Sequence, residues 1–142
     1  MSGKQRREIP RFDTPMIDTH CHLDYLEEVP LPAILEQSRA VGVAQIVTIA
    51  VSPGNLEHVL HLTRQSSDIW GTQGIHPHEA GSFNDEVETL IRRHAADPRI
   101  LAIGEIGLDY YYDHADRAVQ RSVFERQLQL AAELDLPVVI HS

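Results

Sequence analysis

The sequence predicts a parallel α/β protein, because short apolar segments rich in β-branched residues alternate with longer segments of helical spacing. Five apolar segments and four helical segments follow one another between residues 16 and 142. Such alternation gives parallel strands joined by right-handed crossovers, either in a doubly wound sheet or in a barrel. A complete barrel needs eight strands in about 250 residues, and this chain of 142 residues supplies five strands. No Gly-x-Gly-x-x-Gly follows the first strand, so a dinucleotide-binding sheet has no positive support.

The first third of the chain contains two expected strands with a helix between them. The first strand is expected to begin at Met16 and to end in a pair of histidines. Helical spacing predicts a helix over residues 31–41, and Gly42 stands where a left-handed residue would end it. Residues 44–51 are rich in β-branched side chains, so they are expected to form a buried strand.

The middle of the chain continues the same alternation. Ser52 followed by Pro53 is typical of an N-cap with proline at the first helical position, so a second helix is expected to run to about residue 65. A strand weakened by two glycines is expected over residues 69–75, and a third helix over residues 85–95.

The last third predicts a strand over residues 100–105, a helix from about 115 to 134 and a fifth strand over 137–141. The long helix is expected to bury one broad apolar side against the sheet. That side contains Val119, Val123, Leu128, Leu130, Ala131 and Leu134.

The composition describes one globular domain, with net charge -9, 42% hydrophobic residues and one cysteine. Residues 1–15 are polar and aperiodic, and we interpret them as a flexible arm in front of a domain of residues 16–142. They lack the apolar stretch of a secretory signal, and no segment has transmembrane length, so no membrane contact and a cytoplasmic location are expected. The acidic charge disfavours nucleic-acid binding by a broad basic surface, but a bound dication can receive a phosphoryl oxygen on an acidic protein.

Two histidines at the end of the first strand, His20 and His22, are the first candidates for a metal site. Residues i and i+2 of a strand project to the same face, so both imidazoles can reach one cation, and Asp18 lies on that face. Cys21 projects to the opposite face, where a buried small side chain is favoured over a catalytic thiol. A histidine pair alone often occurs by chance, so the prediction depends on the later strands.

Polar residues also stand at the ends of the later strands, and the carboxyl ends of parallel strands meet at one edge of a barrel. These residues are Ser52 after the second strand, His76 and His78 after the third, Glu105 ending the fourth and His141 ending the fifth. Imidazole with carboxylate suits zinc, manganese or nickel better than calcium. A glutamate can bridge two cations through its two oxygens, and water activated by two cations needs no serine or cysteine nucleophile.

Four segments, taken in order, resemble the TatD family of metal-dependent hydrolases. They are Ile-Asp-Thr-His-Cys-His-Leu-Asp at 17–24, Gly-Ile-His-Pro-His at 74–78, Gly-Glu-Ile-Gly-Leu-Asp-Tyr-Tyr at 104–111 and Leu-Pro-Val-Val-Ile-His-Ser at 136–142. The resemblance implies a (β/α) TIM-type barrel, two divalent cations and hydrolysis of phosphodiester bonds in DNA. The sequence does not distinguish magnesium, manganese, zinc and nickel. Residues 16–142 look like the N-terminal portion of such a barrel.

Carried over residue by residue, the resemblance implies metal-binding roles for four residues. His20 and His22 would bind the first cation, and His141 would bind the second. Glu105 would bridge the two cations and is the catalytic candidate. In that family a further histidine and an aspartate from later strands complete the site, and neither has a counterpart in this sequence.

Two groups of residues near these ligands have two interpretations each. His76 and His78 can bind a substrate phosphate, or they can hydrogen-bond the loop around Pro77. The tyrosines at 110–112 can stack on a base, as in proteins that bind single strands, or they can pack a long loop.

Two other functions compete with a TatD-type deoxyribonuclease acting on DNA. A phosphoesterase of the polymerase-and-histidinol-phosphatase type also begins with His-x-His on a strand, but residues 104–111 and the fifth-strand histidine fit the TatD family better. The other alternative is an inactive, truncated half-barrel. Parallel strands without closure expose both sheet edges and the apolar inner face, and such surfaces favour self-association.

Overall fold

Five parallel strands in one curved sheet form the frame of the molecule, in a computed structural model that describes residues 7–142. The strands are β1 (Met16–Cys21), β2 (Val43–Thr48), β3 (Ile69–Gln73), β4 (Ile100–Gly107) and β5 (Val138–His141). Their order in the sheet is β1-β2-β3-β4-β5, and every neighbouring pair is parallel. A doubly wound sheet reverses its strand order at one point. The strand order of this sheet does not reverse, so the sheet is of the barrel type and is not doubly wound.

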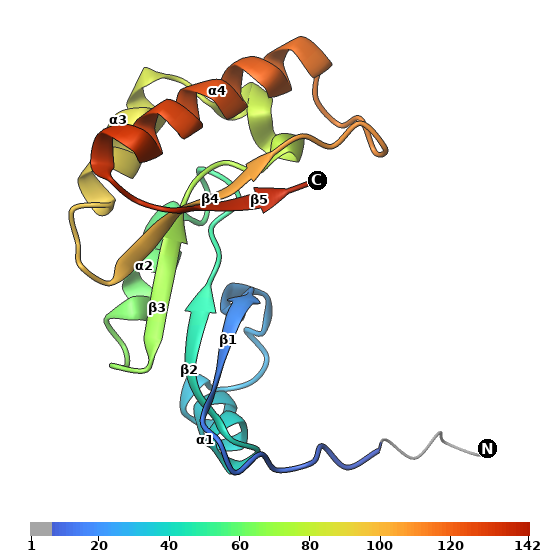
Figure 1. The fold of residues 1–142 in the computed structure, drawn as a ribbon, viewed down its shortest axis with the longest axis vertical. Coiled ribbons are helices and arrows are strands. Elements are labelled where there is room, and N and C mark those ends of the chain that lie inside the picture. The colour runs from blue at the N-terminus through green and yellow to red at the C-terminus, as the bar shows by residue number, and fades with distance from the viewer. Residues whose placement is uncertain (1–6) are drawn as a thin grey trace.

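Helices join successive strands. They are α1 (Leu31–Ala40), α2 (Leu56–Thr63), α3 (Asp85–His94) and α4 (Arg117–Leu134), and two short 3-10 helices, η1 (Leu23–Tyr25) and η2 (Pro77–Ser82), follow β1 and β3. Figure 1 shows α3 and α4 side by side over β4 and β5, with α1 near the lower ends of β1 and β2. Gly42 has φ +97°, which confirms that a left-handed residue follows the first helix.

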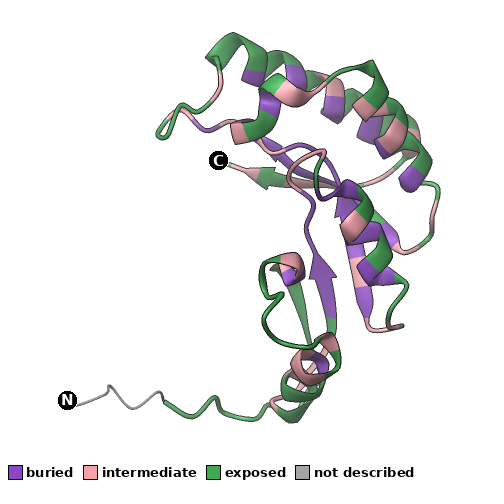
Figure 2. Cartoon of the chain, turned by 180° about the vertical axis from the view of Figure 1, so that it is seen from behind, coloured by how far each residue is buried: buried purple, intermediate pink, exposed green. Residues whose placement is uncertain are grey.

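Two apolar clusters hold the helices against the sheet. The larger cluster contains Ala50, Leu56, Val59, Ile75, Ile91, Ile103, Ile106, Leu130 and Ala131. The smaller cluster contains Leu23, Leu35, Ile46, Leu62 and Ile69. Figure 2 shows that buried residues follow the three central strands, whereas β1 is exposed. The core is therefore central, and the edge strands border open surface.

The second helix begins later than the sequence predicts, so the expected N-cap at Ser52 is wrong. Helix α2 starts at Leu56 with Asn55 as its N-cap residue. The Asn55 Oδ1 accepts hydrogen bonds from the main-chain N–H groups of Val51 and Ser52, at 3.0 and 3.1 Å. An asparagine that bonds nearby main chain stabilises a turn in competition with a helix, and this turn occupies the residues predicted to be the first helical turn.

The buried side of α4 also differs from the prediction. Val119 and Leu128 are 39% and 38% exposed, whereas Gln120 and Gln127 are each 1% exposed. The Gln127 carboxamide pairs with both main-chain groups of Ile75, at 2.8 and 3.1 Å. Buried main-chain groups beyond a strand end need partners, and a glutamine supplies a donor and an acceptor together. These polar side chains therefore face inward, where periodicity alone predicts leucine and valine.

The predicted N-terminal arm lies partly outside the described residues, because residues 1–6 are not among them. Residues 7–15 are exposed and contain no helix or strand. Within them, the Phe12 N–H donates to the Val41 oxygen at 3.1 Å. Over residues 7–142, no helix combines the length and apolarity that crossing a membrane requires.

Candidate metal centre

The carboxyl ends of β1, β3, β4 and β5 surround one polar pocket of about 340 Å³. Five histidines, two glutamates, Tyr25 and Val51 line it. All six residues that the sequence singles out as metal or substrate ligands are among them: His20, His22, His76, His78, Glu105 and His141. Ser52 is not part of this lining.

The first group of candidate ligands consists of His20, His22 and Glu105. One ligand atom from each lies within 4.8 Å of the other two, and the His20 Nε2 is 3.4 Å from the Glu105 Oε2. The His22 Nδ1 is buried and has no hydrogen-bond partner among residues 7–142. Because a buried polar atom without a partner is costly, this nitrogen fits a role as a cation ligand.

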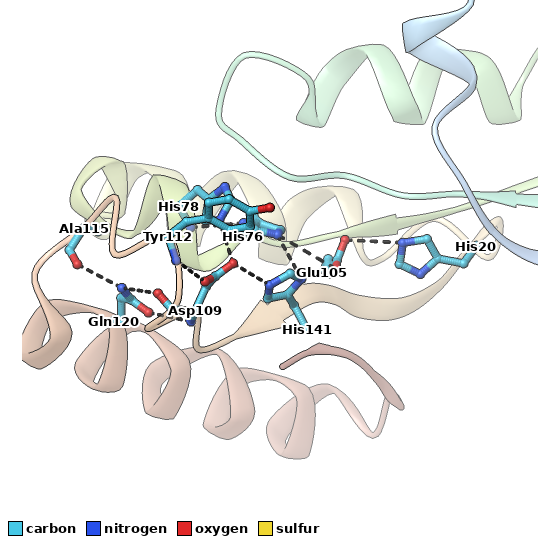
Figure 3. Close-up of polar contacts among 9 residues, drawn as sticks. All are labelled: His20, His76, His78, Glu105, Asp109, Tyr112, Ala115, Gln120 and His141. Carbon is cyan, nitrogen blue, oxygen red and sulfur yellow. Dashed lines mark hydrogen bonds and ion pairs between the residues drawn. The ribbon is translucent and has the colours of Figure 1, made fainter.

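The second group consists of His76, His78 and His141, whose ligand atoms also lie within 4.8 Å of one another. The His141 Nδ1 is 3.1 Å from the Glu105 Oε1 and 3.2 Å from the His76 Nε2. Glu105 therefore directs one oxygen toward His20 and the other toward His141, as Figure 3 shows. Each oxygen of this carboxylate therefore faces a different group of imidazoles.

Asp109 is a site residue that the sequence interpretation missed. Its Oδ2 accepts hydrogen bonds from the His78 Nε2 at 2.7 Å and the His141 Nε2 at 2.9 Å, and its Oδ1 accepts the Tyr112 N–H at 3.0 Å. The Tyr112 N–H, followed by the two imidazoles, holds the pKa of this buried carboxyl well below its usual range. Its position four residues after Glu105, in an otherwise apolar segment, was the signal available in the sequence.

The Asp109 carboxylate fixes which nitrogen of His141 carries the proton. An ionised carboxylate only accepts hydrogen bonds, so the Nε2 of His141 must be the donor. The Nδ1 lone pair then points toward Glu105. A carboxylate that accepts from the distal N–H of a ligand histidine orients the ring and raises its basicity in many metal sites.

His76 contributes to both the local fold and the pocket. Its Nδ1 accepts the His78 main-chain N–H at 3.0 Å, which caps the 3-10 helix η2. Burial lowers the pKa of His76 to about 4, with the neighbouring His141 and His78 acting in the same direction against Glu105 and Asp109. His76 is therefore neutral near pH 7, and because its Nδ1 accepts a hydrogen bond, its proton is on Nε2.

Asp18, Cys21 and a further carboxylate, Asp24, lie near β1 and have structural contacts. The Asp18 Oδ1 accepts the His20 main-chain N–H at 3.1 Å, and the Asp24 Oδ2 accepts from the Asn55 side chain at 3.0 Å. The Cys21 thiol is half buried, and burial raises its pKa to about 12, with Asp18 adding to the effect. A thiol with so high a pKa is a poor nucleophile.

The donor set fits a divalent cation. Imidazole nitrogens and carboxylate oxygens converge from separate strands, and one buried imidazole nitrogen lacks a hydrogen-bond partner in the part of the chain that the structure describes. Such mixed sets suit zinc, manganese or nickel. The fold and the site together define a class, the metal-dependent hydrolases built on a (β/α) barrel.

Comparison with known proteins gives the family. The family model described as TatD-related DNase matches residues 17–142, and the chain belongs to this family. A Bacillus subtilis protein named uncharacterized metal-dependent hydrolase YabD is 30% identical over 128 residues, which are 89% of this chain and 50% of that protein. A 3'-5' ssDNA/RNA exonuclease TatD from Cronobacter sakazakii is 37% identical over 108 residues, 76% of this chain and 41% of the relative.

Solved structures of the family have the same fold. The crystal structure of YjjV, a TatD homologue from Escherichia coli K12, matches with a TM-score of 0.79 and 31% identity over 89% of this chain and 50% of that one. A TatD family hydrolase from Entamoeba histolytica matches with a TM-score of 0.76 at 19% identity, over 95% and 51% of the two chains. The family and the barrel type that the four segments predict are confirmed. The chain spans about half the length, or less, of the relatives it matches.

Proposed function

We propose that this chain provides the strand-end ligands of a metal-dependent deoxyribonuclease of the TatD type, which hydrolyses phosphodiester bonds by activating water between two divalent cations. The observation that carries the proposal is the position of Glu105. Its two oxygens lie 3.4 Å from the His20 Nε2 and 3.1 Å from the His141 Nδ1, so it separates two groups of imidazoles. The name of the Cronobacter relative, an exonuclease of single-stranded DNA and RNA, supports a nucleic-acid substrate.

Each ligand has a distinct task in this proposal. His20 and His22 would hold one cation, His141 would hold the other, and Glu105 would bridge them. Divalent cations in such positions lower the pKa of water and stabilise the charge that develops on a phosphate. Asp109 keeps the proton of His141 on Nε2, so its Nδ1 stays available as a ligand.

The substrate phosphate is assigned to the side of the pocket formed by His76 and His78. Both rings line the pocket, and both lie beside His141 at centroid distances of 4.3 and 6.0 Å. The His76 Nδ1 accepts the His78 main-chain N–H, so the Nε2 of the neutral His76 ring carries the proton and can donate it to a phosphate oxygen without adding a charge that would repel a cation. We therefore retain these two histidines as the substrate-binding candidates.

The proposal is tested with the full chain, single-stranded DNA and added magnesium or manganese. We expect hydrolysis, and we expect His22→Ala and Glu105→Ala each to abolish it because each removes a cation ligand. His61→Ala is the matched control, since His61 is exposed on α2 and its side chain bonds only Gln65 among the described residues.

Three results would change the assignment. Absence of any bound cation in the purified chain would overturn the proposal, and so would full activity of the Glu105→Ala variant. Cleavage of small phosphomonoesters without cleavage of DNA would favour the alternative phosphoesterase function.

A further inference from the structure

We propose that Tyr112 and His114, in the loop between β4 and α4, form a platform on which one base of a single-stranded nucleic acid stacks beside the metal centre. The inference rests on the proposed nucleic-acid substrate and adds a subsite to it. The platform is defined by these two residues. It binds an unpaired base by its aromatic face, without reading the identity of the base.

The tyrosine rings at the tip of this loop are exposed. The residue Tyr112 is 62% exposed and its neighbour Tyr111 is 88% exposed. The Tyr112 ring contacts the rings of Tyr111, His78 and His114. Packing within the loop therefore leaves most of the surface of Tyr111 and Tyr112 open to a base.

The platform is aromatic and continuous with the pocket. The Tyr112 and His114 rings are parallel, with an interplanar angle of 2° and centroids 5.8 Å apart. Each of the two rings makes a T-shaped contact with the His78 ring, with a centroid distance of 5.7 Å for Tyr112 and 4.6 Å for His114. Because His78 lines the metal pocket, a base on the platform would lie next to a phosphate held in that pocket.

The space beside the platform is open. A second hollow of about 280 Å³ adjoins the metal pocket, shares His78 and Glu79 with it, and has His114 in its wall. A nucleotide next to the reacting phosphate therefore has room on this side. Figure 3 shows Tyr112 and His78 on the same side of Asp109, at the opposite end of the site from His20.

The loop is anchored at several points, so the rings have a defined position. The Tyr112 N–H is held by Asp109, which also binds His141. Asp116 caps α4 by accepting the N–H groups of Ala118 and Val119 at 2.8 and 3.2 Å. Arg117 lies over the Tyr110 ring at 4.6 Å. A stacking surface held in this way loses little conformational entropy when it binds.

The charge of the chain makes stacking the more suitable source of affinity. With net charge -9, the chain has no excess of cationic side chains to neutralise a series of phosphates. Base stacking on aromatic rings is independent of net charge and requires a base that is not already paired. The platform therefore favours a single strand over a duplex.

The test measures binding and hydrolysis separately in the full chain. A cleavage-resistant phosphorothioate oligonucleotide with one 2-aminopurine reports stacking by fluorescence quenching, and an ordinary oligonucleotide reports hydrolysis. We expect Tyr112→Ala to raise Kd and KM by about 5- to 150-fold, the range for one stacked base, with little change in kcat. Tyr112→Phe keeps the ring and should behave as wild type, and Tyr112→Ala keeps the N–H that Asp109 binds.

Two controls separate a platform from a general effect on the loop. Tyr111→Ala removes a more exposed ring that contacts Tyr112 but not His78, and it should change Kd much less. An oligonucleotide with an abasic site at the position of the quenched base should bind wild type and Tyr112→Ala equally.

The outcomes distinguish the platform from the proposed function. Unchanged Kd in Tyr112→Ala, or an equal loss in Tyr111→Ala, would overturn the platform even if wild type cleaves DNA. Binding with quenching that depends on Tyr112, but without hydrolysis, would support the platform and overturn the deoxyribonuclease. A wild-type chain that binds no single strand would overturn both.

Discussion

At the scale of single residues, Asp109 connects more parts of the site than any one of the ligands does. It accepts hydrogen bonds from two imidazoles and from the main chain of the β4–α4 loop. Its own main-chain N–H and oxygen are paired with Gln120 at 2.8 and 3.2 Å. Gln120 of α4 thus holds the main chain of Asp109, and the Asp109 carboxylate in turn holds the His141 ring.

Asp109→Asn is expected to weaken cation binding by about 10- to 100-fold, as loss of a carboxylate behind a ligand histidine does elsewhere. The neutral amide has one acceptor oxygen, so it cannot serve both imidazoles and the Tyr112 N–H. Calorimetric titration with Mn²⁺ measures the effect. Asp113→Asn is the matched control, because Asp113 lies in the same loop, is exposed, and has a φ of 55° that asparagine tolerates. Equal affinities for the two variants would contradict the prediction.

At the scale of elements, close packing of α2 on β3 depends on the absence of a side chain at Gly71. A Cβ at this position would lie 2.9 Å from the Thr63 Cγ2 and 3.0 Å from the Val59 Cγ1. Both neighbours are β-branched residues of α2 and are buried. The helix can approach the strand only because this position is a glycine.

Gly71→Ala is expected to lower the free energy of unfolding by about 1–3 kcal/mol, the usual cost of overpacking a core. Urea denaturation followed by circular dichroism measures the change. Gly81→Ala should cost much less, because a Cβ there meets nothing within 4 Å. A result in which both substitutions have the same effect would show that backbone entropy, and not contact with α2, determines the stability at Gly71.

At the scale of the whole molecule, the sheet in residues 7–142 has open edges at β1 and β5. Strand β1 carries Met16 and Ile17, which are 40% and 56% exposed, and β5 carries Ile140, which is 49% exposed. Unpaired edges that also carry apolar side chains favour association with other chains. A strand of another chain that paired with either edge would bury these side chains.

The 142-residue polypeptide, prepared by itself, is therefore expected to self-associate. Sedimentation velocity over a range of concentrations should show species larger than a monomer. Lysine substitutions at Ile17 and Ile140 should shift the distribution toward the monomer, because a charge opposes pairing at an edge. A monomer at all concentrations with a sharp two-state melt would contradict the prediction.

Much of this molecule follows from sequence patterns, and the exceptions have a common cause. The strands, their connections and the meeting of His20, Glu105 and His141 follow from periodicity and from the geometry of parallel strand ends. Asn55 and Gln127 do not follow those patterns because each side chain pairs with main-chain groups, Asn55 with those of the turn before α2 and Gln127 with those of Ile75. Such pairings depend on the folded arrangement, which local spacing does not encode.

The strictly sequential order of the sheet also bears on how the chain folds during synthesis. Each strand pairs with the one made just before it, so every new strand meets an edge that already exists and the loop to be closed is short. His20 and His22 leave the ribosome first, on an edge strand, and Glu105 and His141 follow only with β4 and β5. Within these residues, the two groups of ligands therefore meet only when β4 and β5 join the sheet.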